Sequence, residues 1–248
     1  MVLEYVGTRY FGFQWQAGQP TIQGEVEKAL FRLTGDRIRV VPASRTDTGV
    51  HAKGQVISFR TRTSHSPETF VKALNYYLPG DIAVKEAHQI SPSFDVRRCA
   101  VSREYSYHIL NSLTPSPLRE GFAHRVSGHL DIEAMNQVCE ALIGEHDFVS
   151  FTSGSGAMLR NTVRRVYKAE VTWDEDEVVF NIVASSFLPH QVRNTVGALL
   201  RVGLGRMSYG EFCSIMDAKK LALAGPTAPA CGLFLVKINY DRPFEEER

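Results

Sequence analysis

The sequence predicts an α+β fold in which helices cover one face of a β-sheet. Hydrophobic periodicity over residues 2–87 gives the order strand, helix, strand, strand, helix, strand, which suits such a layer. The Ser-Pro-Ser-Phe-Asp stretch at 91–95 is the best candidate for a linker. We therefore predict an N-terminal α+β domain at 1–92 and a C-terminal α+β domain at 93–248.

Two helices and four strands are predicted in the first domain. Thr21 can cap a helix whose apolar residues recur at helical spacing, and Gly35 can end it. A second helix begins at Ser66-Pro67, where a capping serine precedes a first-turn proline. The predicted strands cover 2–5, 37–41, 55–59 and 82–87.

An aromatic loop, Gly-Thr-Arg-Tyr-Phe-Gly-Phe-Gln-Trp-Gln at 7–16, joins the first strand to the first helix. Its composition favours a hydrophobic plug. The alternative is a nucleic-acid contact loop, because aromatic rings stack on bases while Arg and Gln reach phosphates.

The loop Ser-Arg-Thr-Asp-Thr-Gly-Val-His-Ala at 44–52 lies between two predicted strands. Thr46 and Thr48 can hydrogen-bond nearby backbone, and Gly49 permits a positive φ. Such a loop can aim the Asp47 carboxylate at a fixed point. The plainer interpretation is a hairpin turn in which Asp47 caps backbone amides, and spacing alone favours it.

The second domain opens with a predicted strand at 96–109, whose alternation puts Tyr105 and Tyr107 on one face. Paired tyrosines on a strand belong to the core more often than to catalysis. The basic residues of this strand form either a solvated edge or a phosphate-binding patch. They are Arg97, Arg98 and Arg103.

Residues 187–203 predict a helix with one apolar face and one face that carries Arg193 and Gly197. A small residue at the centre of that face lets a backbone or a ligand approach closely, whereas the plainer interpretation is a solvated face. The other predicted elements are a helix capped by Asp131, strands at 161–173 and 177–185, a short helix from Ser208 and a last strand ending near 238.

Composition sets limits on the function. The formal net charge of +1 argues against a nucleic-acid binder for the chain as a whole, while a local basic patch stays compatible with it. The four cysteines stand far apart without a Cys-x-x-Cys pair, so we expect no metal site, and scattered thiols suit a reducing compartment. Neither a signal peptide pattern nor a membrane-length apolar run is present, so we expect a cytoplasmic protein without a membrane partner.

Several of these blocks resemble the TruA family of tRNA pseudouridine synthases, in the same order and at compatible spacing over nearly the whole chain. The block Arg-Thr-Asp-Thr-Gly-Val-His-Ala at 45–52 resembles the catalytic motif of the family, with departures at Ser44 and Thr48. Further matching blocks lie at 5–16, 94–107, 187–199 and 228–235.

The resemblance implies two α+β halves with RNA-recognition-like antiparallel sheets that flank a central active-site cleft. It implies a homodimer that binds tRNA, uses no cofactor, and isomerises uridine to pseudouridine in the anticodon stem-loop, at positions thirty-eight, thirty-nine and forty. The chemistry is consistent with this. Breaking the glycosidic C–N bond builds positive charge on the sugar, which a carboxylate can stabilise or capture.

The resemblance also implies three catalytic residues, Asp47, Tyr105 and Arg193. Asp47 supplies the carboxylate, Arg193 pairs with it and keeps it ionised, and Tyr105 stacks on the base or relays a proton. Whether Asp47 attacks the sugar, attacks the base or removes a sugar proton stays open.

Four further residues are implied to bind the substrate. The base must leave its stack before it is rejoined through carbon, and the resemblance suggests that Arg45 fills the vacated space. Leu233 packs on the target base. Arg97 and Arg103 match basic positions of the family.

Two other classes of protein remain. A non-catalytic RNA-binding module would tolerate loss of Asp47, yet the set Asp47, Tyr105 and Arg193 is intact. A metal-dependent hydrolase that uses Asp47 and His51 would need a third ligand, which this glycine-containing loop does not supply.

Overall fold

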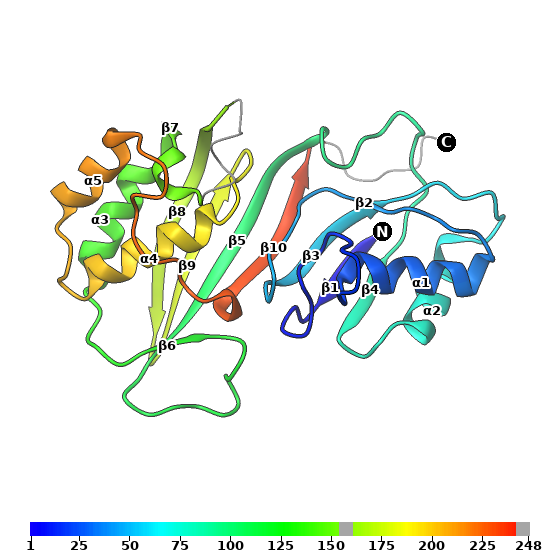
Figure 1. The fold of residues 1–248 in the computed structure, drawn as a ribbon, viewed down its shortest axis with the longest axis horizontal. Helices are drawn as coiled ribbons and strands as arrows, with labels where there is room; N and C mark the ends of the chain where they lie inside the picture. The colour runs from blue at the N-terminus through cyan, green and yellow to red at the C-terminus, as the bar shows by residue number, and fades with distance from the viewer. Residues whose placement is uncertain (154–160, 242–248) are drawn as a thin grey trace. The chain divides into compact units, whose positions relative to one another are not determined.

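A computed structural model describes residues 1–153 and 161–241 (Figure 1). Contacts divide the chain into two compact units, unit 1 at 1–102 and 234–248 and unit 2 at 103–233. This division differs from the predicted domains 1–92 and 93–248 in two places, because residues 93–102 and the chain from Phe234 onward both belong to unit 1. The predicted domains remain a prediction about independently folding parts.

The sheet of unit 1 has the strand order β4-β1-β3-β10. β1 pairs antiparallel with both β4 and β3, whereas β10, the red strand in Figure 1, runs parallel to β3. A two-residue strand, β2, pairs antiparallel with the end of β3. The bounds are β1 Val2–Tyr5, β2 Val41–Pro42, β3 His51–Ser58, β4 Ile82–Glu86 and β10 Leu233–Tyr240.

Both predicted helices of the first part are confirmed, as α1 (Ile22–Thr34) and α2 (Pro67–Tyr77). The Thr21 side chain accepts a hydrogen bond from the Gly24 N–H at the start of α1. Gly35 ends that helix with φ 76°. Local capping chemistry therefore sets these boundaries.

The predicted strand at 37–41 is wrong for most of its length, because only Val41 enters β2. Side chains of α1 hold the preceding backbone instead. The Val40 N–H donates to Glu27 Oε1 at 3.1 Å, and Gln23 Nε2 donates to the Val40 carbonyl at 3.3 Å. These contacts occupy the groups that a strand would have used for pairing.

The sheet of unit 2 has the order β5-β9-β8-β7, all antiparallel, and the short β6 runs parallel to β5. Helix α3 lies against β8, and α4 and α5 both contact α3. The strands are β5 Ala100–Asn111, β6 His124–Val126, β7 Gly144–Asp147, β8 Val163–Asp174 and β9 Glu177–Ala184. The helices are α3 Ile132–Leu142, α4 Gln191–Gly203 and α5 Tyr209–Ala218. The chain is thus a mixed α/β protein, with mostly antiparallel pairing in each unit.

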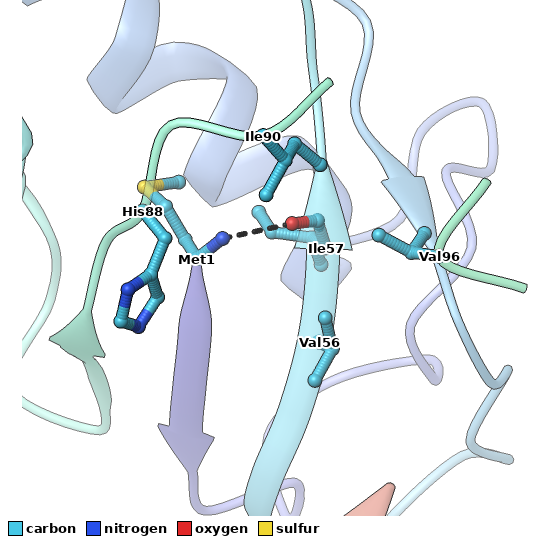
Figure 2. Close-up of a pocket in the computed structure, with 6 residues that line it drawn as sticks. All are labelled: Met1, Val56, Ile57, His88, Ile90 and Val96. Carbon is cyan, nitrogen blue, oxygen red and sulfur yellow. Dashed lines mark hydrogen bonds between the residues drawn. The ribbon is translucent and has the colours of Figure 1, made fainter. Parts of the chain in front are cut away.

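A small hollow in unit 1 lies where the chain begins (Figure 2). The Met1 amine donates to the Ile57 carbonyl at 3.0 Å, and the walls come mainly from Val56, Ile90 and Val96. Burial lowers the pKa of this amine to about 6, although the nearby Glu86 carboxylate opposes the change. The contact fixes the start of β1 against β3. Among the described residues, no helix has the length and apolar character needed to cross a membrane.

Candidate active site

The loop that carries Asp47 joins β2 to β3 in unit 1. The Ala43 N–H donates to the Val56 carbonyl at 2.8 Å as the chain leaves the sheet. Asp47 is half-buried, and its carbonyl accepts the Val50 N–H at 3.2 Å. Gly49 has φ 78°, so the positive φ expected at this glycine is present. A tight turn therefore follows Asp47 and returns the chain to β3.

Buried polar side chains hold the start of this loop. Gln55 on β3 is completely buried, and its Nε2 donates to the Ser44 carbonyl at 2.7 Å. The Tyr5 hydroxyl on β1 lies 2.8 Å from Thr46 Oγ1, and Gln55 Nε2 is 3.4 Å from the same hydroxyl. This network was not predicted from the sequence. The available signal was a glutamine directly before the apolar pair Val56 and Ile57 of β3.

The aromatic loop at 7–16 packs against the Asp47 loop. The Phe13 N–H donates to the Thr46 carbonyl at 3.0 Å, and the Gly49 N–H donates to the Tyr10 carbonyl at 3.3 Å. A Cβ atom on Gly12 would lie 2.8 Å from the Thr46 carbonyl oxygen, so only glycine permits this approach. Tyr10 and Phe13 are buried, which confirms the hydrophobic plug for these two rings.

Tyr10 ties the aromatic loop to the turn before β4. Its hydroxyl donates to Asp81 Oδ1 at 2.5 Å, and the Arg9 guanidinium lies 3.2 Å from Asp81 Oδ2. Burial raises the pKa of Tyr10, and the hydrogen bond to Asp81 raises it further. The phenol therefore stays a donor at neutral pH, and the first part of the aromatic loop is anchored to Asp81.

His51, the second residue of the hydrolase alternative, has a structural role. Its ring is buried and stacks on Phe234 with centroids 4.6 Å apart. Its Nδ1 accepts the Gly7 N–H at 3.2 Å. In the parts of the chain that the structure describes, no three His, Cys, Asp or Glu side chains converge as metal ligands.

In unit 2, Tyr105 and Tyr107 lie on the same face of β5, as predicted. The buried Tyr105 ring meets Phe187 edge to face, with centroids 5.1 Å apart. The Tyr107 hydroxyl donates to the Pro229 carbonyl at 2.8 Å. Burial raises the pKa of Tyr107 and Cys231 adds to the effect, while Arg193 opposes it. Tyr107 therefore serves as a neutral donor that holds the segment before β10.

Helix α4 holds the same segment. Arg193 Nε donates to the Ala228 carbonyl at 2.8 Å, and the Ala228 N–H donates back to the Arg193 carbonyl at 3.1 Å. A Cβ atom on Gly197 would lie 2.0 Å from the Pro226 carbonyl oxygen. The backbone at Pro226 is therefore what approaches Gly197 closely. The interpretation of this face of α4 as exposed to solvent is wrong. Leu233, 4% exposed, ends the segment.

The basic residues before and within the first part of β5 do not share one environment. Arg97 and Arg98 are exposed, and both backbone N–H groups donate to Asp95 Oδ1, at 2.8 and 3.0 Å. Arg103 is only 7% exposed, and its Nη1 donates to the Ser185 carbonyl at 2.7 Å. The expected basic patch therefore consists of Arg97 and Arg98. The substrate-binding roles of Arg97 and Arg103 stay predictions.

The candidate residues fall into one set per unit. Unit 1 carries Arg45, which is exposed, with Asp47 and Arg97, and unit 2 carries the others. In unit 2 the segment 226–233 links Arg193, Tyr107 and Leu233 through the contacts given above. The members in unit 2 are Arg103, Tyr105, Arg193 and Leu233.

Comparisons with known proteins agree over most of the chain. A family model described as tRNA pseudouridine synthase matches residues 1–97 and 138–241. The tRNA pseudouridine synthase A of an Exiguobacterium strain is 42% identical over 242 residues, covering 98% of this chain and 97% of that protein. The protein of the same name from Roseiflexus castenholzii is 41% identical over 242 residues, covering 96% and 88%. That from Acetivibrio thermocellus is 39% identical over 240 residues, covering 97% and 98%.

Among solved structures, a chain in the crystal structure of a Cbf5-Nop10-Gar1 complex matches with a TM-score of 0.40 and 15% identity. The match covers 82% of this chain and 45% of that one, and a TM-score this low supports no conclusion about function. The family model and the full-length relatives confirm the predicted family. The chain belongs to the tRNA pseudouridine synthases, which are isomerases.

Proposed function

We propose that this chain isomerises uridine to pseudouridine in the anticodon stem-loop of tRNA, at positions thirty-eight, thirty-nine and forty, with Asp47 as the catalytic carboxylate. The observation that supports this proposal is that the loop carrying Asp47 is held in a fixed position. Its loop is held by Gln55 on one side and by the Phe13 N–H on the other. A carboxylate held in place before the substrate arrives costs no reorganisation during the reaction.

The reaction rearranges the bonds of a single nucleotide. The bond between the sugar C1′ and the base N1 breaks, the base turns, and a bond forms between C1′ and C5. The proton on C5 leaves and N1 gains one, so the product keeps the composition of the substrate. No external oxidant or group donor is needed. Positive charge that develops on the sugar during C–N cleavage is what Asp47 would stabilise or capture.

The residues of unit 2 complete the proposed site. Arg193 would pair with Asp47, Tyr105 would lie against the flipped base, and Leu233 would pack on that base. The contacts within unit 2 support the grouping of these residues, since Arg193 and Tyr107 both donate to the segment 226–233, which ends at Leu233. The central active-site cleft between two RNA-recognition-like halves is part of this proposal.

We further propose a homodimer whose tRNA contacts come from both subunits. The net charge of +1 is low for a tRNA-binding enzyme, and a second copy would double the exposed Arg97 and Arg98 pair. The exposed Arg97 would contact phosphate in this proposal, while the substrate-binding role of the buried Arg103 stays a prediction. Light scattering of the active protein tests the dimer, and a fully active monomer would reject it.

The test of the catalytic role uses tRNA labelled with tritium at C5 of uridine, because the C5 proton is released in this reaction. Asp47→Asn should release no tritium, while the tRNA affinity should stay within about tenfold of the parent protein. Asp47→Ala, run in parallel, excludes activity from slow deamidation of the asparagine. Asp36→Asn, which changes an exposed aspartate elsewhere in unit 1, is the matched control and should keep full activity.

Two results would contradict the proposal. Pseudouridine formed by purified Asp47→Ala would remove Asp47 from the chemistry. A parent protein that binds tRNA without releasing tritium would favour the non-catalytic RNA-binding module. Stem-loop RNAs that each carry one uridine, at position thirty-eight, thirty-nine or forty, test the choice of site.

A further inference from the structure

Trp15 is a large, half-exposed ring held in a defined position. It is 49% exposed, and its backbone N–H donates to Gln23 Oε1 at 2.9 Å. Gln23 itself is buried on α1. Trp15 Cδ1 lies 3.7 Å from where a Cβ atom on Gly24 would stand, so the ring edge rests on a part of α1 without a side chain. Contacts with α1 therefore hold the Trp15 ring in place while half of the side chain stays exposed to solvent.

A cation is fixed over this ring. The Arg39 guanidinium carbon lies 5.7 Å from the Trp15 ring centroid, within the range of a cation–π contact. Arg39 Nη1 is also 3.2 Å from Glu27 Oε2 on α1, which restrains the guanidinium. The sequence places neither residue in the matched catalytic motif. Trp15 and Arg39 thus form a paired aromatic and basic surface that the proposed mechanism does not use.

Trp15 belongs to the aromatic loop at 7–16, which packs on the Asp47 loop. Phe13, two residues before Trp15, gives its N–H to the Thr46 carbonyl at 3.0 Å. Phe11, 43% exposed, stands on the other side of Gly12, and Gln16 Nε2 donates to the Phe11 carbonyl at 2.7 Å. Gly12 and Phe13, which both approach the Thr46 carbonyl of the candidate catalytic loop, therefore lie between the two exposed rings.

We propose that Trp15 and Arg39 bind an unpaired nucleotide of the substrate RNA, with the base stacked on the indole and the guanidinium paired with a phosphate. The proposal rests on the proposed function and adds to it a site for a nucleotide other than the target uridine. Aromatic rings and guanidinium planes both stack on bases that are free of a helix. Bases inside a duplex show only their edges, so the site selects single-stranded RNA.

The chain allows a direct measurement of this contact. It has two tryptophans, Trp15 and Trp173, and the second is an exposed residue at the end of β8. In Trp173→Phe protein, all tryptophan fluorescence comes from Trp15. Titration with an anticodon stem-loop RNA should quench this fluorescence, with a midpoint equal to the dissociation constant from filter binding. A blunt duplex with the sequence of the same stem should leave it unchanged.

Substitutions test whether the contact contributes to affinity. Trp15→Ala should weaken binding of the stem-loop RNA at least about fivefold, the lower end of a single base–aromatic stack. Trp15→Phe should retain most of the affinity. Arg39→Gln should weaken binding more than Arg32→Gln, which removes the same charge from the exposed side of α1. Tyr76→Ala, at an 83% exposed ring on α2, should change nothing.

Each other outcome overturns the proposal. Bound stem-loop RNA that leaves Trp15 fluorescence unchanged would show that the ring is only packed on α1. Equal quenching by the duplex would show a backbone contact instead of a stacked base. Pseudouridine formation by the Trp173→Phe protein separates this site from the proposed function, because a protein that modifies the stem-loop RNA without any quenching of Trp15 would overturn the nucleotide site alone. A parent protein that neither binds the RNA nor modifies it would reject both.

Discussion

Gln55 contacts both backbone groups of Ser44. Its Nε2 donates to the Ser44 carbonyl at 2.7 Å, and its Oε1 accepts the Ser44 N–H at 3.4 Å. Gln55 stands in the middle of β3 and is completely buried, whereas Ser44 begins the loop that leads to Asp47. Gln55 thus fixes the start of the candidate catalytic loop to the sheet, in addition to the contact between Tyr5 and Thr46.

We predict that Gln55→Leu lowers both stability and turnover. The substitution removes this donor from the partly buried Ser44 carbonyl, which costs about 1–3 kcal/mol in the free energy of unfolding. The looser loop should lower kcat more than it weakens tRNA binding, because Gln55 acts through Ser44. Urea unfolding and tritium release measure the two effects. Gln89→Leu, at an exposed glutamine, is the control.

Two results would contradict a positioning role for Gln55. If Gln55→Leu keeps the kcat of the parent protein, the clamp on Ser44 does not position Asp47. If stability falls while kcat stays the same, Gln55 contributes to folding alone.

The features that the sequence predicts well are those set by a few neighbouring residues. Thr21 and Ser66 cap α1 and α2 as predicted, because a cap depends on residues within one helical turn. The capping box of α5 is also present, with the Ser208 side chain and the Glu211 side chain bonded reciprocally. The order of strands and helices follows from hydrophobic periodicity in the same way.

The features that the sequence could not predict depend on residues far apart in the chain. The strand expected at 37–41 is replaced by irregular chain because Glu27 and Gln23 bind the Val40 backbone. Arginine is a residue type that often binds phosphate, yet the Arg103 guanidinium donates to the carbonyl of Ser185, which is 82 residues away in the sequence. The resemblance predicts Asp47 as the catalytic carboxylate, and the structure adds the aromatic loop that packs against the loop carrying it.

Gly197 gives a second prediction, based on a close backbone approach. A Cβ atom there would lie 2.0 Å from the Pro226 carbonyl oxygen, so Gly197→Ala must displace the 226–233 segment or α4. We expect a loss of about 1–3 kcal/mol in unfolding free energy, as for overpacking of a buried site. Turnover should fall as well, because the same segment holds Arg193 and Leu233.

The matched control for Gly197→Ala is Gly210→Ala. Gly210 lies in the first turn of α5, and a Cβ atom there meets no atom within 4 Å. Alanine at that position should leave the protein as stable or raise its stability by up to about 1 kcal/mol, since it restricts the unfolded chain. Equal stability of both variants in urea would contradict the close approach seen at Gly197.

Arg193 gives a third prediction, which separates its hydrogen bond from its charge. Arg193→Met removes both the charge and the Nε donor to the Ala228 carbonyl, whereas Arg193→Lys keeps a charge without that geometry. We expect both variants to turn over slowly, with Arg193→Met the slower. A stability loss of about 1 kcal/mol should be common to both, because each loses one hydrogen bond. If Arg193→Met reacts at the rate of the parent protein in single-turnover measurements, Arg193 has no role in the active site.

Arg45 should fail in a different way, because we propose that it acts before the chemistry. It is exposed on the loop two residues before Asp47, so its side chain can enter RNA without unfolding the protein. Removing a base from its stack costs a few kcal/mol, and a side chain that fills the vacated space offsets part of that cost. Arg45→Ala should therefore slow pseudouridine formation strongly on a paired target uridine, at saturating RNA and with little change in protein stability.

The decisive comparison varies the substrate instead of the protein. One stem-loop RNA carries the target uridine opposite adenosine, and a second carries the same uridine opposite a base that cannot pair with it. The unpaired uridine has already lost part of its stacking and pairing energy, so the defect of Arg45→Ala should be relieved on it. Arg193→Met should be slow on both RNAs, because its proposed role lies with the carboxylate. An equal loss on both RNAs for Arg45→Ala would mean that Arg45 does not assist base flipping and instead holds a phosphate or the Asp47 loop.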